Sequence, residues 1–570
     1  MVNVIIDGQS ISANEGTTIL EAAVNSGIHI HTLCYLKDLC DIGACRVCVV
    51  EIEGDTNLSA ACNTVIEDGM VIKTNSRRVR EARKVNVELL LSEHEVICPS
   101  CVRGGNCSLQ SVAENLGILE IPYETKFSTK PWDSNHFLIR DESKCIKCMR
   151  CLYVCDNMQS LGVWDLSGIG TRLTIKVAEG KSIDDSVCVL CGQCVMHCPV
   201  GALYARDDTA KVLDALDNPE KVVIMQIAPA VRTAWGEGFN LSREKASVGR
   251  MVAAARKLGV NFVFDTSFGA DMTIIEESAE LLQRLSNREN KKWPMFTSCC
   301  PGWVSFIKSQ YPELIANLST TKSPQQIFGS TAKTWFAKHA GIDAAKLFSV
   351  AVMPCMAKKM ECSLPGMDSA KTGQDVDVVI TNREFIKLLQ TYSVCVDLLD
   401  EEEFDDLLGD GTGAGVIFGS TGGVMEAVLR TGYYLATGKN PEPDTFSVIR
   451  GKDATREVTV DMNGTKLKAV VVSGLANTRK LIDKILSGEV MYDFVEVMAC
   501  PGGCVGGGGQ PIKDGKDLTL ERAPVLYDLD KNSEKRFSHE NPSAVKSYEE
   551  FYKKPLSKEA QELLHITHDR

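Results

Sequence analysis

The chain of 570 residues is too long for one hydrophobic core, so several domains are expected. Its 44% hydrophobic and 24% charged residues are typical of globular proteins, and no apolar run is long enough for a membrane helix. The net charge of −13 argues against nucleic acid as a partner, because phosphate binding needs a basic surface. The N-terminus, MVNVIIDGQS, lacks a secretory signal pattern, so we expect a cytoplasmic protein.

Cysteine is the informative residue type, because the chain has 23 of them. In a reducing compartment thiols rarely form structural disulfides, and clustered cysteines there usually bind metal. The cysteines fall into four blocks along the chain, and each block predicts a separate metal centre or pair of centres.

The first block follows a predicted β-grasp-like domain, in which the alternating segments VNVIIDG and ISA precede a helix TTILEAAVNSG that ends at Gly27. Four thiolates in the next segment are suited to a 2Fe-2S cluster. Cys40 fits the plant-type spacing, but Cys34 competes with it. Residues 31–50 resemble the N-terminal domain of iron-only hydrogenases and of a large complex I subunit, and this resemblance implies as ligands Cys34, Cys45, Cys48 and Cys62.

The second block follows the helical pattern VREARKVNVELLLSEHE and consists of His94, Cys98, Cys101 and Cys107. Three thiolates and one imidazole fill a four-ligand site, and from these residues alone zinc competes with iron. The same relatives carry this spacing as a 4Fe-4S cluster with one His ligand, so the resemblance implies iron.

A basic patch lies at the start of the same helix: Arg77, Arg78, Arg80, Arg83 and Lys84. Its simplest interpretation is a solvated helix face. Docking of an acidic ferredoxin is the alternative.

The third block contains two C-x2-C-x2-C-x3-C runs, the pattern of a bacterial ferredoxin with two 4Fe-4S clusters. In such folds the fourth Cys of each run ligates the other cluster. One predicted cluster therefore uses Cys145, Cys148, Cys151 and Cys198. The other uses Cys188, Cys191, Cys194 and Cys155.

From about residue 210, apolar strand-like runs alternate with helices, as in KVVIMQIAP, NFVFDT, LFSVAVMP, AGVIFGST and LKAVVVSG. This alternation predicts an α/β domain with mostly parallel sheets. The fourth block of cysteines stands here in three separate motifs, TSCCP (297–301), MPCMAK (353–358) and MACPGGC (498–504). We expect loops at strand ends to bring these motifs together at one site.

The three motifs resemble the signature motifs of the iron-only (FeFe) hydrogenases, in the family's order. The resemblance implies an H-cluster: a 4Fe-4S cubane on Cys300, Cys355, Cys500 and Cys504, with Cys504 bridging to a two-iron subsite that carries carbon monoxide, cyanide and azadithiolate ligands. It implies Lys358 as a hydrogen-bond donor to a cyanide. The resemblance also places Ala230, Met353, Glu361, Met498 and Gly503 at the cluster. Ala230 stands where some relatives have a Ser that can hydrogen-bond a cyanide, so this contact is expected to be missing. Ordinary core packing is the alternative for Met353 and Met498.

A buried iron site needs a path of titratable groups for its protons. Glu277, Glu280 and Arg284 are spaced three and four apart in a predicted helix and share one face. By themselves they predict a solvated stripe. The family resemblance instead implies a relay through Cys299, Glu277, Ser319, Glu280 and Arg284, with Cys299 as the first donor to the amine.

We therefore predict an α/β multidomain protein of four parts. These are a plant-type 2Fe-2S ferredoxin-like β-grasp domain (1–78), a small 4Fe-4S domain with one histidine and three cysteine ligands (79–125), a bacterial-type ferredoxin domain with two 4Fe-4S clusters (126–209), and a large H-cluster catalytic domain with a C-terminal small-subunit-like segment (210–570).

The predicted activity is the reversible conversion of protons and electrons to H2. Ferredoxin or flavodoxin is the expected electron partner, acting through one 2Fe-2S and three accessory 4Fe-4S clusters, and maturation proteins are expected to insert the H-cluster. A non-catalytic assembly or sensory relative is the first alternative, but intact Cys299, Lys358 and Cys504 argue against it. An electron-transfer subunit of an NADH-linked complex is the second, and it would not need the H-cluster motifs.

Overall fold

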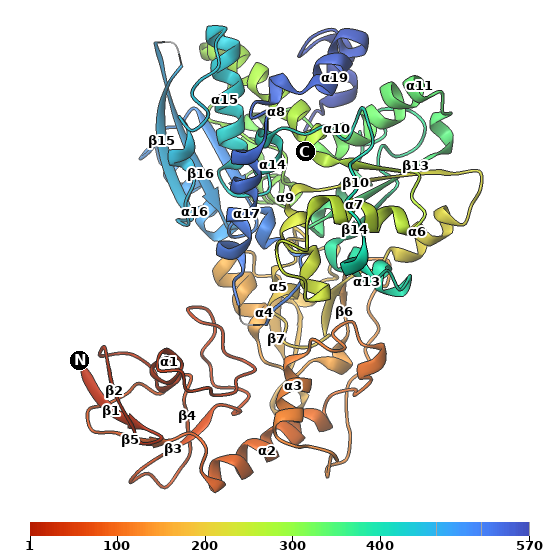
Figure 1. The fold of residues 1–570 in the computed structure, drawn as a ribbon. Coiled ribbons are helices and arrows are strands. Elements are labelled where there is room, and N and C mark those ends of the chain that lie inside the picture. The colour runs from red at the N-terminus through yellow and green to blue at the C-terminus, as the bar shows by residue number, and fades with distance from the viewer. Residues whose placement is uncertain (463, 515, 569–570) are drawn as a thin grey trace. The chain divides into compact units, whose positions relative to one another are not determined.

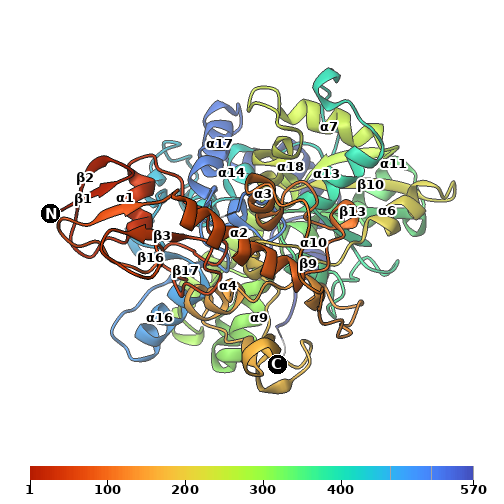
Figure 2. The same cartoon turned by 90° about the horizontal axis from the view of Figure 1, so that it is seen from below.

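The computed structural model describes residues 1–462, 464–514 and 516–568. The chain divides into two compact units, shown from two directions in Figures 1 and 2. The first unit comprises Met1–Ser186, Gln193–Arg206 and Ile512–Lys516. The second comprises Val187–Gly192, Asp207–Pro511 and Asp517–Arg570. Among the described helices, none has both the length and the apolar character needed to span a bilayer.

The elements of the first unit, in chain order, are β1 (Val2–Ile6), β2 (Gln9–Ala13), α1 (Ile19–Asn25), β3 (Val49–Ile52), β4 (Ser59–Ala60), β5 (Val71–Lys73), α2 (Arg77–Ser92), α3 (Ser108–Asn115), β6 (Leu138–Arg140), α4 (Arg150–Tyr153), β7 (Trp164–Ser167), β8 (Thr174–Val177), α5 (Gln193–Met196) and β9 (Leu203–Ala205).

The N-terminal part of this unit is a five-stranded sheet in the order β2-β1-β5-β3-β4, in which β1 and β5 run parallel. Asp7 and Gly8 both have positive φ, as a two-residue hairpin turn between β1 and β2 requires. Thr18 caps α1 and forms a capping box with Glu21. The helix packs its apolar face on the sheet, which buries Ile6, Ile19 and neighbouring side chains.

The elements of the second unit, in chain order, are α6 (Thr209–Leu216), β10 (Val222–Ile227), α7 (Val248–Lys257), β11 (Phe262–Asp265), α8 (Thr266–Ser286), β12 (Met295–Phe296), α9 (Pro301–Gln310), α10 (Pro324–Thr331), α11 (Ala337–Ala340), β13 (Leu347–Met353), α12 (Ala357–Glu361), β14 (Val378–Thr381), α13 (Asn382–Thr391), α14 (Gly413–Ile417), α15 (Gly423–Thr437), β15 (Thr455–Met462), β16 (Thr465–Ser473), α16 (Leu475–Leu486), β17 (Phe494–Met498), α17 (Thr519–Asn532), α18 (Pro542–Ser547) and α19 (Lys558–Leu564).

Two four-stranded sheets organise the second unit. The sheet β11-β10-β13-β14 is parallel throughout, and in the sheet β12-β17-β16-β15 β15 alone runs antiparallel to its neighbour. Helices α8, α9 and α14 lie between the two sheets in Figure 1. The three cysteine motifs follow directly on β12, β13 and β17, so one motif comes from the first sheet and two from the second.

One predicted strand is wrong. The run AGVIFGST does not join a sheet, because its first residues form helix α14. Thr412 caps that helix by accepting the N–H of Gly415, and residues 413–417 are all buried. A short apolar run that is buried on every side has the same pattern in a strand and in a helix, so periodicity could not separate the two.

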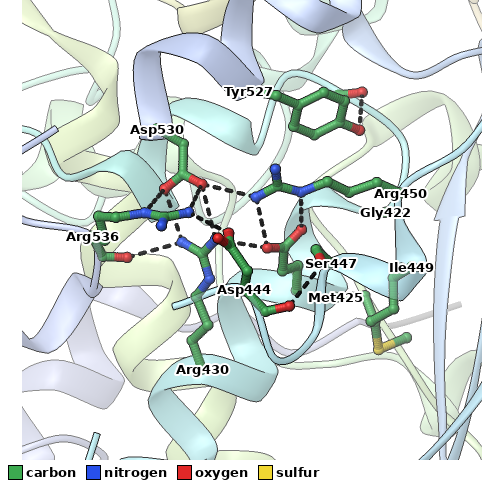
Figure 3. Close-up of polar contacts among 12 residues, drawn as sticks. Gly422, Met425, Arg430, Asp444, Ser447, Ile449, Arg450, Tyr527, Asp530 and Arg536 are labelled. Carbon is green, nitrogen blue, oxygen red and sulfur yellow. Dashed lines mark hydrogen bonds and ion pairs between the residues drawn. The ribbon is translucent and has the colours of Figure 1, made fainter. Parts of the chain in front are cut away.

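A buried cluster of charged side chains attaches the C-terminal segment to the rest of the second unit (Figure 3). Asp530 of α17 accepts two 2.9 Å hydrogen bonds from Arg430 of α15, and it also bonds Arg450 and Arg536. Burial acts to raise the pKa of Asp530, but Arg430 and Arg536 outweigh it and lower that pKa to about 2. Because Arg430 also bonds Glu426, no carboxylate in the cluster is left unpaired.

Candidate functional site

The four thiols of Cys34, Cys45, Cys48 and Cys62 meet inside the first unit. Hydrogen bonds from Cys45 and then from Cys62 hold the pKa of the Cys34 thiol well below its usual range. Cys48 also hydrogen-bonds Cys62. The fifth thiol, Cys40, points elsewhere and donates to the carbonyl oxygen of Cys148 at 3.9 Å. The structure therefore groups Cys34, and not Cys40, with the other three.

Arg83 supports the loop that carries Cys45 and Cys48. The predicted solvated basic patch is wrong at this position, because Arg83 is buried at 5% exposure. Its guanidinium donates to the carbonyl oxygens of Val47 at 2.9 Å, Val49 at 3.1 Å and Thr74 at 3.2 Å. The side chain turns inward because these carbonyls need donors.

His94 is placed to offer one ring nitrogen to a metal. It is buried just beyond α2, and its Nδ1 lies 2.9 Å from the carbonyl oxygen of Lys144. That contact assigns the ring proton to Nδ1 and leaves the lone pair on Nε2. Cys98 and Cys101 lie in the loop before α3 and Cys107 directly precedes that helix. The Cys101 sulfur accepts the N–H of Arg103 at 3.5 Å, a contact suited to a cluster thiolate.

One of the two crossed cysteine sets predicted for the ferredoxin-like runs comes together in the structure. Three cysteines of the first run and one of the second line a single cavity of about 20 Å³, closed by apolar side chains such as Trp164 and Ile175. The four cysteines are Cys145, Cys148, Cys151 and Cys198. Of the other predicted set, Cys155 and Cys194 belong to the first unit, and Cys188 and Cys191 belong to the second.

The metal-binding blocks of the first unit touch one another. A Cβ added at Gly201 would lie 2.6 Å from the Cys101 sulfur, so Gly201 lets the segment after Cys198 pack against the second block. Arg150 donates to the carbonyl oxygen of Tyr35, next to Cys34, at 2.9 Å. These contacts bring the ligand-bearing segments of neighbouring blocks together.

The three motifs of the second unit surround a buried cavity of about 80 Å³. Its lining includes Cys299, Cys300, Cys355, Cys504, Lys358, Ala230, Met353 and Met498. Cys500 is buried beside them, and the neighbouring Cys355 and Cys300 add to the burial that raises the pKa of its thiol. The remaining walls are mostly apolar, with Pro324 and Phe418 among them. Thiols and one cation therefore share a mostly apolar cavity.

Lys358 is the cation, and Glu361 holds it in place. Its Nζ donates to the Glu361 carboxylate at 2.9 Å and to the Cys299 carbonyl oxygen at 3.1 Å. Burial acts to lower the pKa of Lys358, but the Glu361 carboxylate outweighs burial and keeps that pKa above its usual value. Glu361 also accepts bonds from Ser323 and Gln325.

Sequence reasoning missed Gln325. It lines the cavity, and its Oε1 has no hydrogen-bond partner among the described residues. It stands outside every cysteine motif, so no local pattern signals its role.

Glycines allow the three loops to approach each other closely. A Cβ at Gly507 would lie 2.2 Å from the Pro354 carbonyl oxygen, and one at Gly508 would lie 2.5 Å from the Cys191 carbonyl oxygen. Gly503 has a φ of +90°, and a Cβ there would lie 2.6 Å from the Thr421 nitrogen. Side chains at these positions would force the loops apart.

The face of α8 with Glu277, Glu280 and Arg284 is buried, so the solvated stripe expected from spacing alone is wrong. These side chains are 1%, 5% and 5% exposed because the segment around Ser319 covers them. Glu280 accepts bonds from Arg284 Nη2 at 2.6 Å and from the Ser319 hydroxyl at 3.2 Å. Burial raises the pKa of Glu277 to about 8 against an opposing hydrogen bond from Ser319, and its Oε2 has no hydrogen-bond partner among the described side chains. Burial raises the pKa of the Cys299 thiol, and the charge of the Glu277 carboxyl raises it further.

Comparisons with known proteins place this geometry in a family. The model of the iron only hydrogenase large subunit, C-terminal domain, matches residues 221–508. NADP-reducing hydrogenase subunit HndD of Solidesulfovibrio fructosivorans is 46% identical over 99% of this chain and 98% of its own length. Iron hydrogenase 1 of Clostridium pasteurianum is 42% identical over 100% of both chains. The chain belongs to the iron-only hydrogenase family.

Further matches extend over the rest of the hydrogenase. Residues 1–77 match the model of a 2Fe-2S iron-sulfur cluster binding domain, and residues 83–122 match that of the NADH-ubiquinone oxidoreductase-G iron-sulfur binding region. Residues 144–202 match a 4Fe-4S dicluster domain, and residues 516–570 match the iron hydrogenase small subunit. A solved structure of the [FeFe]-hydrogenase HydA1 from Chlamydomonas reinhardtii is 38% identical, covers 63% of this chain and 98% of that chain, and has a TM-score of 0.57.

The hydrogenase is an oxidoreductase that carries 2Fe-2S and 4Fe-4S clusters and the H-cluster of its family. The cavity fits the H-cluster. Thiols converge from loops of two sheets, Lys358 offers a buried ammonium to an anionic ligand, and Gln325 and Glu277 each present an unpaired oxygen in or beside the site.

Replacing Cys34 with Ala is expected to remove the 2Fe-2S cluster, whereas replacing Cys40 with Ala leaves it in place, because only Cys34 lies with the other three thiols. Iron content should fall by about two atoms per chain in the first variant alone, with loss of the 2Fe-2S electron paramagnetic resonance signal. The reverse result would assign the ligand to Cys40.

Replacing Glu277 with Gln is expected to stabilise the fold increasingly as pH rises. Between its ordinary pKa and the folded value of about 8, native Glu277 keeps a proton that the unfolded chain has released, so the free energy of unfolding falls across this window. Gln removes that loss. Thermal unfolding midpoints of variant and wild type should diverge from about pH 5 to about pH 8.

Glu280→Gln is the matched control. It leaves the buried Arg284 guanidinium without its carboxylate partner, so it should lower the unfolding midpoint at about pH 5 and at about pH 8 alike. A difference between Glu277→Gln and wild type that stays the same at every pH would contradict the assigned pKa.

Proposed function

We propose that this iron-only hydrogenase interconverts H2 with two protons and two electrons at an H-cluster held by Cys300, Cys355, Cys500 and Cys504. The observation that carries the proposal is the single buried cavity in which the loops after β12, β13 and β17 bring these cysteines together beside Lys358. The mostly apolar walls of this cavity disfavour bulk water beside the metal chemistry.

The bound H-cluster supplies the redox-active irons and the basic amine at which protons and electrons combine. The chain's own residues attach it, tune it and move protons. Lys358, oriented by its hydrogen bond to Glu361, would donate a charge-assisted hydrogen bond to an anionic ligand of the cluster. Met353, Met498 and Ala230 pack around the site and exclude water.

The proton relay runs from Cys299 through Glu277 and Ser319 to Glu280. Support comes from the raised pKa of Glu277 and the hydrogen bonds of Ser319 to Glu277 and Glu280. A carboxyl with a pKa of about 8 can both take and release a proton near neutral pH, which is what a relay needs. Arg284 orients Glu280 through its 2.6 Å bond.

We further propose the predicted four-part division, with domains over 1–78, 79–125, 126–209 and 210–570. The family matches to residues 1–77, 83–122, 144–202 and 221–508 support it. The five-stranded sheet packed on α1 supports the β-grasp assignment. This division carries one 2Fe-2S and three accessory 4Fe-4S clusters, on the ligand sets predicted above.

Ferredoxin or flavodoxin is the electron partner we propose, in the cytoplasm, with maturation proteins supplying the H-cluster. The exposed arginine and lysine side chains at the start of α2 support an acidic carrier. A second candidate follows from the similarity to a protein named as a subunit of an NADP-reducing hydrogenase: this chain would then pass electrons from H2 to a partner subunit that reduces NADP.

Anaerobically matured protein is expected to show infrared bands of carbon monoxide and cyanide ligands. Cys299→Ala should keep those bands and lower hydrogen turnover by about 100-fold or more, because the first proton donor is gone. Cys362→Ala is the control, since Cys362 is similarly buried but does not line the cavity, and its thiol bonds the carbonyl oxygens of Lys358 and Lys359 within α12. Absence of the bands in fully iron-loaded, matured protein would refute the H-cluster assignment, and an active Cys299→Ala would refute the relay.

Reduced ferredoxin is expected to support hydrogen evolution by the chain alone, whereas NADPH is not. The double substitution Arg77→Glu and Lys84→Glu should raise the KM for ferredoxin severalfold and leave turnover with reduced methyl viologen unchanged, since that small dye needs no docking surface. Turnover with NADPH, or an unchanged KM, would count against ferredoxin docking at α2.

A further inference from the structure

Arg284, the last member of the relay, is not suited to release protons. Its guanidinium keeps its charge at all accessible pH values, so it cannot alternately lose and gain a proton. It is 5% exposed, and it is tied to Glu280 and to the carbonyl oxygens of Asn317 and Leu318. Protons that reach Glu280 therefore need another carrier to reach solvent.

A hydrogen-bonded line leaves Glu280 in a different direction. Its Oε2 lies 3.0 Å from the Thr320 hydroxyl, and that hydroxyl lies 2.8 Å from Nδ1 of His565 in the C-terminal segment. The segment is pinned there because Ile566 donates to the Thr320 carbonyl oxygen at 2.7 Å and Lys322 donates to the Leu564 carbonyl oxygen at 2.8 Å. The imidazole is thus held against the relay by backbone pairing.

The other ring nitrogen faces a second buried carboxylate. Nε2 of His565 lies 3.0 Å from Glu276 Oε2, and Glu276 also accepts the Tyr548 hydroxyl at 2.5 Å and the Leu556 N–H at 2.8 Å. With the Tyr548 hydroxyl and the Leu556 N–H both donating to it, the Glu276 carboxyl is the acceptor of the third contact as well, so Nε2 carries a proton.

The direction of the Thr320 hydroxyl then decides the charge of the ring. If the hydroxyl donates to Glu280, Nδ1 is protonated and the ring is an imidazolium. If Glu280 holds the proton, the hydroxyl donates to a neutral ring. The two states differ by one proton moved through one hydroxyl.

The ring of His565 also lines a large cavity of about 1160 Å³. The cavity wall includes Lys308, Lys322, Glu559, Glu562 and His568. It reaches the surface, because Glu562 on the wall is 65% exposed. A cavity of this size and polarity has ample room for water.

We propose that His565 carries protons between Glu280 and solvent, an inference that rests on the proposed function. On the way out, Glu280 gives its proton to the Thr320 oxygen while the Thr320 hydroxyl proton passes to Nδ1. The imidazolium then turns its Nδ1–H from Thr320 into the cavity, gives that proton to water, and returns as the neutral ring with its other proton still on Nε2. The reverse sequence brings a proton in. Glu276 positions the ring, and no electron or further reactant takes part.

The test uses matured, full-length protein and the exchange of D2 with solvent protons, which needs protons but no electron donor. His565→Ala and His565→Gln are both expected to lower the exchange rate about tenfold or more, and Gln fails because it can hydrogen-bond but cannot carry a proton. Added imidazole should restore exchange in His565→Ala, because the cavity admits it. Pyrazole, of the same size but far less basic, should not.

His568→Ala is the matched control, since His568 lines the same cavity but its Nε2 contacts the Ser319 carbonyl oxygen. It should exchange at nearly the wild-type rate and show no response to imidazole. Unchanged exchange in His565→Ala overturns the proposal. So does full activity of His565→Gln, which would make the ring only a support for Thr320, and so does a loss that imidazole does not restore. Wild-type protein with neither exchange nor infrared bands would instead sink the proposed function.

Discussion

The contact between the loop after β13 and the glycine-rich loop after β17 is the constraint on which the rest of the second unit depends. Gly509 donates to the Pro354 carbonyl oxygen at 2.7 Å, and Gly507 lies too close to the same carbonyl to carry a side chain. The contact joins the ends of two separate sheets. Because the sheets are rigid and parallel at this edge, the cysteines that follow their strands meet in one cavity and stay apart from solvent.

Burial then determines how each charge near the cavity behaves. Arg284 is buried and the Lys358 side chain is 11% exposed, and each has a carboxylate partner, so they keep their charge and orient their neighbours. Glu277 has no cationic partner in contact among the described side chains, and burial therefore favours its neutral form. The same apolar surroundings thus leave Lys358 and Arg284 with fixed charges and make Glu277 a titratable group. The fixed charges suit electrostatic support, and the titratable carboxyl suits a proton carrier.

The proposed routes of electrons and protons to this cavity are lined by different kinds of residue. On one side the segment 188–192 packs on the motif loops, with the Cys500 thiol 3.8 Å from the Cys191 carbonyl oxygen. On the other side α8 and the segment around Ser319 present carboxylates and hydroxyls. Cluster ligands must be soft thiolates, whereas proton carriers must be groups with accessible pKa values. Cysteine is the residue type that serves both proposed routes, as proton donor at Cys299 and as cluster ligand at its neighbour Cys300.

The sequence by itself determined what depends on spacing and donor chemistry: the four cysteine blocks, the crossed ligand pattern of the ferredoxin-like runs, the strands that precede each motif and the family. The tertiary structure decided what depends on surroundings. It separated Cys34 from Cys40, buried Arg83 and the face of α8, made a helix of the run AGVIFGST, and brought His565 from the end of the chain to Thr320. Local patterns report which residues share a face, but burial and pairing arise only when distant segments cover that face.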